Sequence, residues 1–350
     1  MTAFAGLGLG ANVVIFMAMA AVVWMAGVRI TRYANVISIR TGIGQAVVGM
    51  LLLGGVTSLP ELAVTASAAA QGSGGLAVNS LLGAVAMQVV ILAMADFAVR
   101  GRALTAVVPN PLVLLQGAFV ILLLCVVVSA TVVGDVAFLR VGLWMWLLLF
   151  VGVFALRTLA RAGDRQPWRA SDHAELEDQE RRRAEAAAEG DASTDLRSSL
   201  VGAAVAGTLI VAAGSVLSLT GDAIASQTGL GGNFVGLVLL AFATALPEIS
   251  TVMTAARAGL YTLAVSDIFG TNLFDVLLLV MVDAISGREP VLNDVGSFST
   301  FAAVLGMAVV VMFVAGVAER RDRTFLRMGI DSVGVFATYA GGLVILFFLR

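Results

Sequence analysis

Two short strings combine a hydroxyl residue, a proline and a glutamate, and each lies deep inside an apolar stretch. They are Thr57-Ser58-Leu59-Pro60-Glu61 and Thr244-Ala245-Leu246-Pro247-Glu248, which lie 187 positions apart (244 − 57). An ionised carboxylate at the centre of a membrane helix costs roughly 2.5–3.5 kcal/mol on insertion scales. Two such residues in matching contexts therefore predict a site that binds a charged species.

The atoms that the two strings offer to a ligand are all oxygens. Pro60 and Pro247 have no N–H, so the carbonyls of Val56 and Ala243, four residues earlier, lose their helical partners. In hydrocarbon, irregular backbone survives only where it is buried in protein or lines a cavity. Hard cations such as Ca²⁺ take six to eight oxygen ligands, whereas softer metals favour His or Cys, and the chain has one of each. The strings therefore favour a hard cation.

The charge of the two glutamates, Glu61 and Glu248, suits exchange better than passive leak. Two carboxylates neutralise one divalent ion, and without that ion they would repel each other, so one would hold a proton or attract monovalent cations. The alternative is that both are ion-paired acids without a ligand. No basic residue lies at a comparable depth in either apolar stretch to make such a pair.

The strings belong to an internal repeat. Residues 57–96 align with residues 244–283 without a gap, and fifteen of the forty positions are identical. The matches at Thr, Pro, Glu, Gly and Asp carry the comparison, because Ala, Leu and Val match by chance in apolar chains. The sequence is therefore interpreted as a duplication.

The composition predicts an all-α integral membrane protein, since 59% of the 350 residues are hydrophobic and only 13% are charged. Apolar runs of about 20 residues are long enough to span a bilayer as helices. Ten such spans are expected, near residues 6–27, 42–70, 75–98, 110–131, 139–159, 199–220, 232–256, 261–285, 297–317 and 328–349.

The distribution of arginine predicts the orientation in the cell membrane. With the N-terminus outside and ten spans, only Arg140, Arg288 and Arg350 of the 21 basic residues face outward, as the positive-inside rule requires. Both termini are then outside and residues 160–198 are cytoplasmic. Five spans lie on each side of this segment, so the two five-helix repeats have inverted topology, which in secondary transporters places the site at the midplane between the halves.

The ten expected spans divide the chain into two halves, 1–159 and 199–350, with repeats at about 42–98 and 232–285. The charged segment 160–198 between them is expected to be a solvated linker whose centre could form a helix ending at Gly190. Its acidic residues lack the spacing of a calcium-binding loop. Its histidine, His173, is the only one in the chain and is expected to be exposed, without a metal-binding role.

The two strings, each followed about twenty residues later by a glycine-containing helix, resemble the alpha-repeats of sodium/calcium exchangers. These exchangers belong to the calcium/cation antiporter superfamily, and their repeats read roughly G-T-S-L-P-E and then G-N-x-x-G-S-N. The resemblance covers both repeats and the ten-span architecture. The calcium/proton branch instead has G-N-x-x-E around its acidic residue, which neither repeat here shows.

The resemblance implies a set of ion ligands. Glu61 and Glu248 match the acidic ligands that calcium and sodium share, and Thr57, Ser58 and Thr244 match the hydroxyl and carbonyl ligands of the flanking sodium sites. In the second repeat, Asp267 falls on a polar ligand position, and the string Gly270-Thr271-Asn272 matches G-S-N, which adds Asn272 to the candidate ligands.

The first repeat departs from the family pattern at these positions. It has Asn79-Ser80 where Gly-Asn is expected and Gly83-Ala84-Val85 where G-S-N is expected, and the second repeat has Ala245 where Ser is usual. Either Ser80 replaces the missing asparagine, or a local shift brings Asn79 into its place. The departures remove up to three oxygen ligands and leave the number of sodium sites and the driving ion open.

Three further acids lie in the same spans. Asp275 lies eight residues after Asp267, a little over two helical turns, so it either binds the ion or makes structural hydrogen bonds. Gln88 is its counterpart in the first repeat. Asp96 and Asp283 close their spans, and we expect both to face water.

The function expected from these features is alternating-access exchange of Ca²⁺ for Na⁺, with exchange of Ca²⁺ or another cation for H⁺ as the alternative. Spans 6–27 and 199–220 would slide past a core of four broken helices, which are the pairs 42–70 with 75–98 and 232–256 with 261–285. An intramembrane enzyme is disfavoured because the one histidine lies in the linker, and a channel because it would repeat a pore-lining ring. The expected partners are these ions and the bilayer, with no nucleic acid and no bound cofactor; by analogy a monomer suffices for transport.

Overall fold

The computed structural model describes residues 4, 6–99, 102–162, 173–190, 195–228, 234–287, 289–325 and 328–349, which are almost entirely helical. The elements of the first half and the middle segment are α1 (Leu9–Thr41), α2 (Gln45–Val48), η1 (Gly49–Gly54), α3 (Gly55–Thr57), α4 (Leu59–Ala70), α5 (Gly74–Ala95), η2 (Asp96–Ala98), α6 (Leu104–Val107), α7 (Leu112–Val133), β1 (Ala137–Phe138), β2 (Val141–Gly142), α8 (Leu143–Ala162) and α9 (His173–Gly190). Those of the second half are α10 (Leu196–Gln227), α11 (Phe234–Ala258), α12 (Tyr261–Ser286), η3 (Val291–Asn293), α13 (Ser297–Glu319), β3 (Thr324–Phe325), β4 (Met328–Gly329) and α14 (Ile330–Leu349).

The helices confirm a multi-pass membrane protein. Among the described residues, eight helices are long and apolar enough to cross a membrane, and the bent pair Gln45–Thr57 with Leu59–Ala70 brings the number to nine. Helix α11 occupies the remaining expected span and has 25 residues, which is about 37 Å at 1.5 Å per residue. The arrangement is consistent with the ten expected spans.

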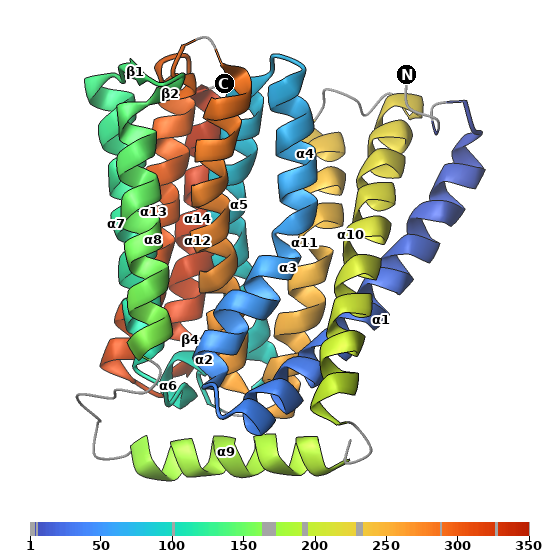
Figure 1. The fold of residues 1–350 in the computed structure, drawn as a ribbon, viewed down its shortest axis with the longest axis vertical. Helices are drawn as coiled ribbons and strands as arrows, with labels where there is room; N and C mark the ends of the chain where they lie inside the picture. The colour runs from blue at the N-terminus through green and yellow to red at the C-terminus, as the bar shows by residue number, and fades with distance from the viewer. Residues whose placement is uncertain are drawn as a thin grey trace.

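Helices α1 and α10 pack side by side along one flank of the bundle (Figure 1). They contain 33 and 32 residues, far more than their expected spans 6–27 and 199–220. In α1 the helix continues through Arg29, Arg32 and Arg40 to Thr41. Arginine favours helix formation, so the apolar run ends well before the helix does.

Proline breaks the helix in the first repeat only. There η1 is a π-helical turn, Ser58 separates α3 from α4, and the two parts are bent by 43°. In the second repeat, α11 runs through Pro247 without interruption, and α5 and α12 are also continuous. The expectation of four broken helices is therefore wrong for three of them. A proline removes a single helical bond, whereas the first repeat also contains a π-helical turn, which changes the hydrogen-bonding pattern directly before the bend.

The two halves repeat each other far beyond the aligned region. Strands β1 and β2 pair Ala137 with Gly142, and β3 and β4 pair Thr324 with Gly329, each residue 187 positions after its counterpart. The first hairpin lies at one end of the bundle and β4 lies at the opposite end (Figure 1). The duplicated halves therefore run in opposite directions through the molecule.

Two buried aspartates tie the halves together in matching ways. Asp96 accepts hydrogen bonds from the backbone N–H of Leu104 (2.5 Å) and of Gly329 (2.5 Å). Its repeat counterpart Asp283 accepts them from Val291 (2.6 Å) and Gly142 (2.7 Å). Each carboxylate therefore binds one N–H from its own half and one from the other half.

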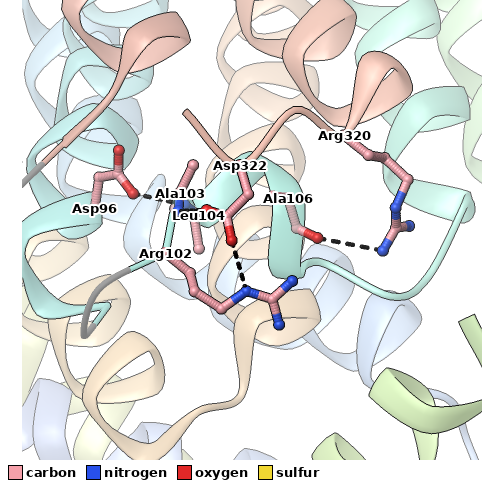
Figure 2. A network of polar contacts seen from close by, with 7 residues as sticks. All are labelled: Asp96, Arg102, Ala103, Leu104, Ala106, Arg320 and Asp322. Atoms are coloured by element: carbon pink, nitrogen blue, oxygen red, sulfur yellow. Dashed lines mark hydrogen bonds and ion pairs between the residues drawn. The ribbon is translucent and has the colours of Figure 1, made fainter. Parts of the chain in front are cut away.

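The expectation that Asp96 and Asp283 face water is wrong, since they are 0% and 2% exposed. Backbone N–H groups take the place of water as donors. Around Asp96 the contact between the halves continues on the surface: Asp322 accepts from Arg102 Nε and from the backbone N–H of Ala103, each at 2.9 Å, and Arg320 donates to the carbonyl of Ala106 at 3.2 Å. Figure 2 shows this network.

The ends of the bundle differ in what covers them. The start of α1 and the end of α14 lie at one end, and α9 lies across the other (Figure 1). Helix α9 was expected to be part of a solvated linker, and the structure corrects this in part, because Glu180 and Ala184 are buried. The side chain of His173 lies outside the described residues.

Candidate cation-binding site

The bend in the first repeat and the proline in the second each position a buried glutamate. Glu61 lies in the first turn of α4 and is 7% exposed, and Glu248 follows Pro247 in α11 and is 0% exposed. The two are close enough for their negative charges to interact. Glu61 Oε2 and both carboxylate oxygens of Glu248 have no hydrogen-bond partner. Buried polar atoms are normally paired, so three free carboxylate oxygens at one place fit a cation site.

Asp275 on α12 adds a third carboxylate at the contact between the halves. Gln88 Nε2 of α5 donates to Asp275 Oδ2 at 2.8 Å, and these two residues are separated by 187 positions. Residues at the repeat distance touch each other only near the axis that relates the repeats. Asp275 also interacts electrostatically with Glu61 and Glu248. Glu61, Glu248 and Asp275 therefore lie together where the two repeats meet.

A fourth carboxylate is that of Asp267, which lies on α12. It is close enough to Glu248 of α11 for their charges to interact. Thr251 of α11 donates its hydroxyl hydrogen to Asp267 Oδ2, and Asp267 Oδ1 has no partner. Asn272 lies five residues further along the same helix, fully buried, and neither its side-chain oxygen nor its nitrogen is paired. Asp267 and Asn272 thus add unpaired oxygens to the second-repeat side of the site.

The π-helical turn η1 packs directly on the backbone of α12 beside these residues. A Cβ atom on Gly54 would lie 2.6 Å from Thr271 N and 2.9 Å from Asp267 O, so only glycine permits this approach. The approach brings Thr57 Oγ1 to 3.0 Å from Thr271 Oγ1. Thr57 is fully buried, and its hydroxyl lies within the contact between the two helices.

The other expected ligands are placed less centrally. Ser58 lies at the bend, beside Asp275, and Thr244 is half-buried one helical turn before Glu248. Ser80 is exposed, whereas Asn79 Oδ1 accepts a hydrogen bond from Ser299 of α13. Neither alternative for the missing first-repeat ligand therefore hydrogen-bonds to one of the four carboxylates.

In the part of the chain that the structure describes, no three His, Cys, Asp or Glu side chains lie close enough together to hold a metal ion. A Ca²⁺ ion here would therefore be shared between two carboxylates and neutral hydroxyl, amide or carbonyl oxygens. Ca²⁺ accepts such mixed oxygen sets.

Comparison with known proteins decides the family. The family model described as "Sodium/calcium exchanger protein" matches residues 11–161 and residues 198–348, one match for each half. The chain belongs to the sodium/calcium exchanger family. The resemblance found in the two alpha-repeats is thereby confirmed.

Relatives of this family member include a bacterial protein and animal exchangers. The "Inner membrane protein YrbG" of Escherichia coli (strain K12) is 27% identical over 266 residues, which cover 73% of this chain and 74% of the relative. The "Sodium/potassium/calcium exchanger 1" of Homo sapiens is 30% identical over 96 residues. That match covers 26% of this chain and only 9% of the human protein, so the chain matches less than a tenth of that relative.

Solved structures of the sodium-calcium exchanger NCX_Mj share the fold. The one soaked with 10 mM Na⁺ and zero Ca²⁺ has a TM-score of 0.69 and 15% sequence identity, covering 96% of this chain and 99% of the other. The one soaked with 2.5 mM Na⁺ and 0.1 mM Sr²⁺ has a TM-score of 0.70 and 14% identity over the same shares. The all-α fold of two repeat halves is thereby confirmed for nearly the whole chain.

Three residues of this exchanger-family site carried weak signals in the sequence. Thr251 lies three positions after Glu248, and Thr271 lies four positions after Asp267, spacings that place side chains on one helix face. Thr271 is part of the Gly270-Thr271-Asn272 motif, and Gln88 is the counterpart of Asp275. Their hydrogen bonds to Asp267, Thr57 and Asp275 come from contacts between different helices, which a single sequence does not reveal.

Proposed function

We propose that this chain is a secondary antiporter that exchanges Ca²⁺ for Na⁺ across a cell membrane by alternating access. The observation that carries the proposal is the group of buried, unpaired carboxylate oxygens on Glu61 and Glu248 at the contact between inverted repeats. Inverted repeats with a charged site between them are typical of secondary transporters. Membership of the sodium/calcium exchanger family supports the choice of the two ions.

The coupling follows from sharing the two glutamates. Ca²⁺ supplies two positive charges and would be neutralised by Glu61 and Glu248 together, with hydroxyls and carbonyls completing its oxygen shell. When Ca²⁺ leaves, the two like charges remain buried and close to each other, which is costly until monovalent cations replace it. Ca²⁺ and Na⁺ would therefore compete for the same oxygens, so that one drives the other across.

The moving part in this proposal is the pair α1 and α10, which contacts the core through small residues. A Cβ atom on Gly27 of α1 would meet Ser250 of α11, and one on Gly207 of α10 would lie 3.2 Å from Val56. A cavity of about 470 Å³ also lies between α10 and the segment containing Val56 and Leu59. The contact of α10 with this segment is therefore lightly filled, which suits sliding better than an interlocked contact would, whereas Gly27 of α1 packs closely against Ser250.

The proposed orientation has both termini outside and α9 in the cytoplasm. Helix α1 begins, and helix α14 ends, on the side of the bundle opposite α9 (Figure 1). The arginines near α9 include Arg102, Arg183 and Arg257, which line one cavity there. By the positive-inside rule this end faces the cytoplasm.

The test is Ca²⁺ uptake into proteoliposomes that carry an outward Na⁺ gradient, compared with an outward H⁺ gradient. Glu248→Gln should lower Na⁺-driven uptake at least about 100-fold, because a lost charged ligand in a buried site is worth roughly 3 kcal/mol. Asp294→Asn, which changes an exposed acid, is the matched control and should transport normally.

Ca²⁺ uptake that is driven only by the H⁺ gradient would show that H⁺, and not Na⁺, is the coupling ion. Equal uptake by the Glu248→Gln variant would contradict the shared-glutamate mechanism. Uptake that needs no gradient of either ion would contradict exchange itself.

A further inference from the structure

Helix α9 buries one of its faces against the end of the bundle. Glu180 is 6% exposed and Ala184, four residues later, is 0% exposed, so both lie on the same face of the helix. The opposite face is solvated, and there Arg181 pairs with Glu185 at 2.9 Å and Arg182 with Asp178 at 3.0 Å. The charge of the segment is thus confined mainly to one face, and the other face is docked.

The docked face holds the start of α12 through Glu180. Glu180 Oε1 accepts from the backbone N–H of Thr262 at 2.7 Å, and Oε2 accepts from the Thr262 hydroxyl, also at 2.7 Å. Thr262 is the second residue of α12, where a helix has no internal acceptor for its N–H groups. Helix α9 therefore caps the helix that carries Asp267 and Asp275.

The same face also holds α1. Asn35 Nδ2 of α1 donates to the backbone carbonyl of Ala184 at 2.8 Å, and Asn35 Oδ1 accepts from Gln45 at 3.1 Å. Asn35 is 2% exposed, and its hydrogen bond to Ala184 is protected from water. One turn of α9 thus connects the proposed moving helix to the helix that carries the ion-binding acids.

We propose that α9 is a clamp that holds α1 against α12 and must release before α1 and α10 can slide, with Glu180 as the positioning residue that sets the release. The inference rests on the alternating-access function proposed above. It follows from the two sets of buried hydrogen bonds, which join elements on either side of the sliding contact. Helix α9 also forms one wall of a cavity of about 1260 Å³ against the ends of α5, α11 and α12, and release would open this space.

The clamp is sensitive to pH through the same carboxyl group. Burial raises the pKa of Glu180 from 4.5 to about 7, and the hydrogen bonds from Thr262 and the charge of Arg183 oppose this only in part. Arg183 itself lies over the ring of Tyr261. Other charged groups on this side include Arg102 and Arg257, which line the adjoining cavity, and Glu177, one turn earlier on α9.

The direction in which docking changes with pH follows from the raised pKa of Glu180. The docked state binds the Glu180 proton more tightly than the released state does, so docking is strongest below about pH 4.5 and weakens as pH rises through 7. A protonated Glu180 keeps both contacts, because it can donate to the Thr262 hydroxyl and still accept the N–H. With pKa values of 4.5 and about 7, the fraction released rises about tenfold between pH 6 and pH 8.

The test measures the release of α9 directly. The protein is placed in nanodiscs, which leave both faces of the membrane accessible to the reagent. Cys125 is replaced by Ala, and Ala184→Cys is labelled with a maleimide; Ala187→Cys, at an exposed position of the same helix, corrects for the pH dependence of the thiol. The labelling ratio of the two variants should rise about tenfold from pH 6 to pH 8. A ratio that is independent of pH, or equal to one throughout, would overturn the proposal.

Two changes at Glu180 should move the ratio in opposite directions. Glu180→Gln imitates a side chain that is protonated in both the docked and the released state, so it should hold the ratio below the pH 6 value of the unmodified Glu180 across the whole range. Glu180→Ala removes the contact and should raise the ratio at every pH. Glu180→Gln should also lower the maximal rate of Na⁺-driven Ca²⁺ uptake at pH 8 several-fold without changing the KM for Ca²⁺.

The transport and labelling results separate the clamp from the proposed function. Normal uptake by Glu180→Gln together with a low labelling ratio would show that α9 need not release, and would overturn the clamp alone. If the unmodified chain showed no Na⁺-driven uptake, the proposed function would fail, and the labelling ratio would still decide whether α9 docks through Glu180.

Discussion

At the scale of single residues, the second half supplies more of the buried acid than the first. Asp267 and Asp275 lie on α12, and the residues at the corresponding positions of α5 are Ser80 and Gln88. Ser80 is exposed, whereas Asp267 is fully buried. The proposed ion site is therefore asymmetric, although the backbone around it repeats.

This asymmetry predicts a specific role for Asp267 in the affinity for Ca²⁺. Asp267→Asn keeps an oxygen for the Thr251 hydroxyl and removes only the charge, so the protein should fold normally. The KM for Ca²⁺ uptake should rise about tenfold or more, because a hydrogen bond or ligand contact to a charged group is worth roughly 1.5–3 kcal/mol. Uptake measured over a range of Ca²⁺ concentrations checks this, and an unchanged KM would remove Asp267 from the ion site.

The central acids could be predicted from the sequence, because the cost of burying a carboxylate makes each one conspicuous in an apolar stretch. The neutral residues that hydrogen-bond to these acids could not be predicted from the sequence. Thr251 and Thr271 look like ordinary helix residues, and their hydrogen bonds depend on how α11, α12 and α3 pack. Glu180 was hidden for the opposite reason: among the many charges of its segment, nothing marks it as the buried one.

At the scale of elements, the structure differs from the expected spans where helix formation and hydrophobicity diverge. Apolar content predicts where a helix crosses the bilayer, but α1 continues into an arginine-containing segment that still favours a helix. Proline was expected to break both repeats, yet α11 continues through Pro247. The break in the first repeat requires the π-helical turn η1 beside Pro60, and a π-helical turn has no reliable sequence signal.

The contact between α10 and the first repeat predicts that a crosslink will stop transport. Val56→Cys and Gly207→Cys in the Cys125→Ala background place two thiols at a position where a Gly207 Cβ would lie 3.2 Å from a Val56 methyl, so the two side chains are in direct contact, as a disulfide requires. Oxidation should lower Na⁺-driven Ca²⁺ uptake at least about tenfold, and a reductant should restore it. Each single cysteine variant, oxidised in the same way, is the control; full activity of the crosslinked protein would contradict the sliding mechanism.

At the scale of the whole molecule, the crossed aspartates join the two halves by matching hydrogen bonds at both ends of the bundle. Asp96 and Asp283 each accept two N–H groups, one from each half. Replacing either by Asn leaves one donor facing an NH₂ group, which costs about 1–3 kcal/mol. Asp96→Asn and Asp283→Asn should therefore lower the Tm by similar amounts.

The double variant should show the sum of the two shifts, because distant sites without shared partners are additive. Thermal unfolding of the purified protein measures all three variants, and Asp294→Asn is the matched surface control. A large shift for only one of the two single variants would mean that the two ends are not equivalent.

The hydrogen bond between Gln88 and Asp275 has a consequence for how such a chain could arise. A residue on the axis between repeats meets its own copy, so two unfused, identical halves would place the same side chain on both sides. Two aspartates there would repel each other, and two glutamines would lack the charge. The Gln–Asp pair requires two different residues at one ancestral position, which two copies can carry only after their sequences have diverged. Duplication of the half thus allowed the centre of the molecule to become chemically unequal.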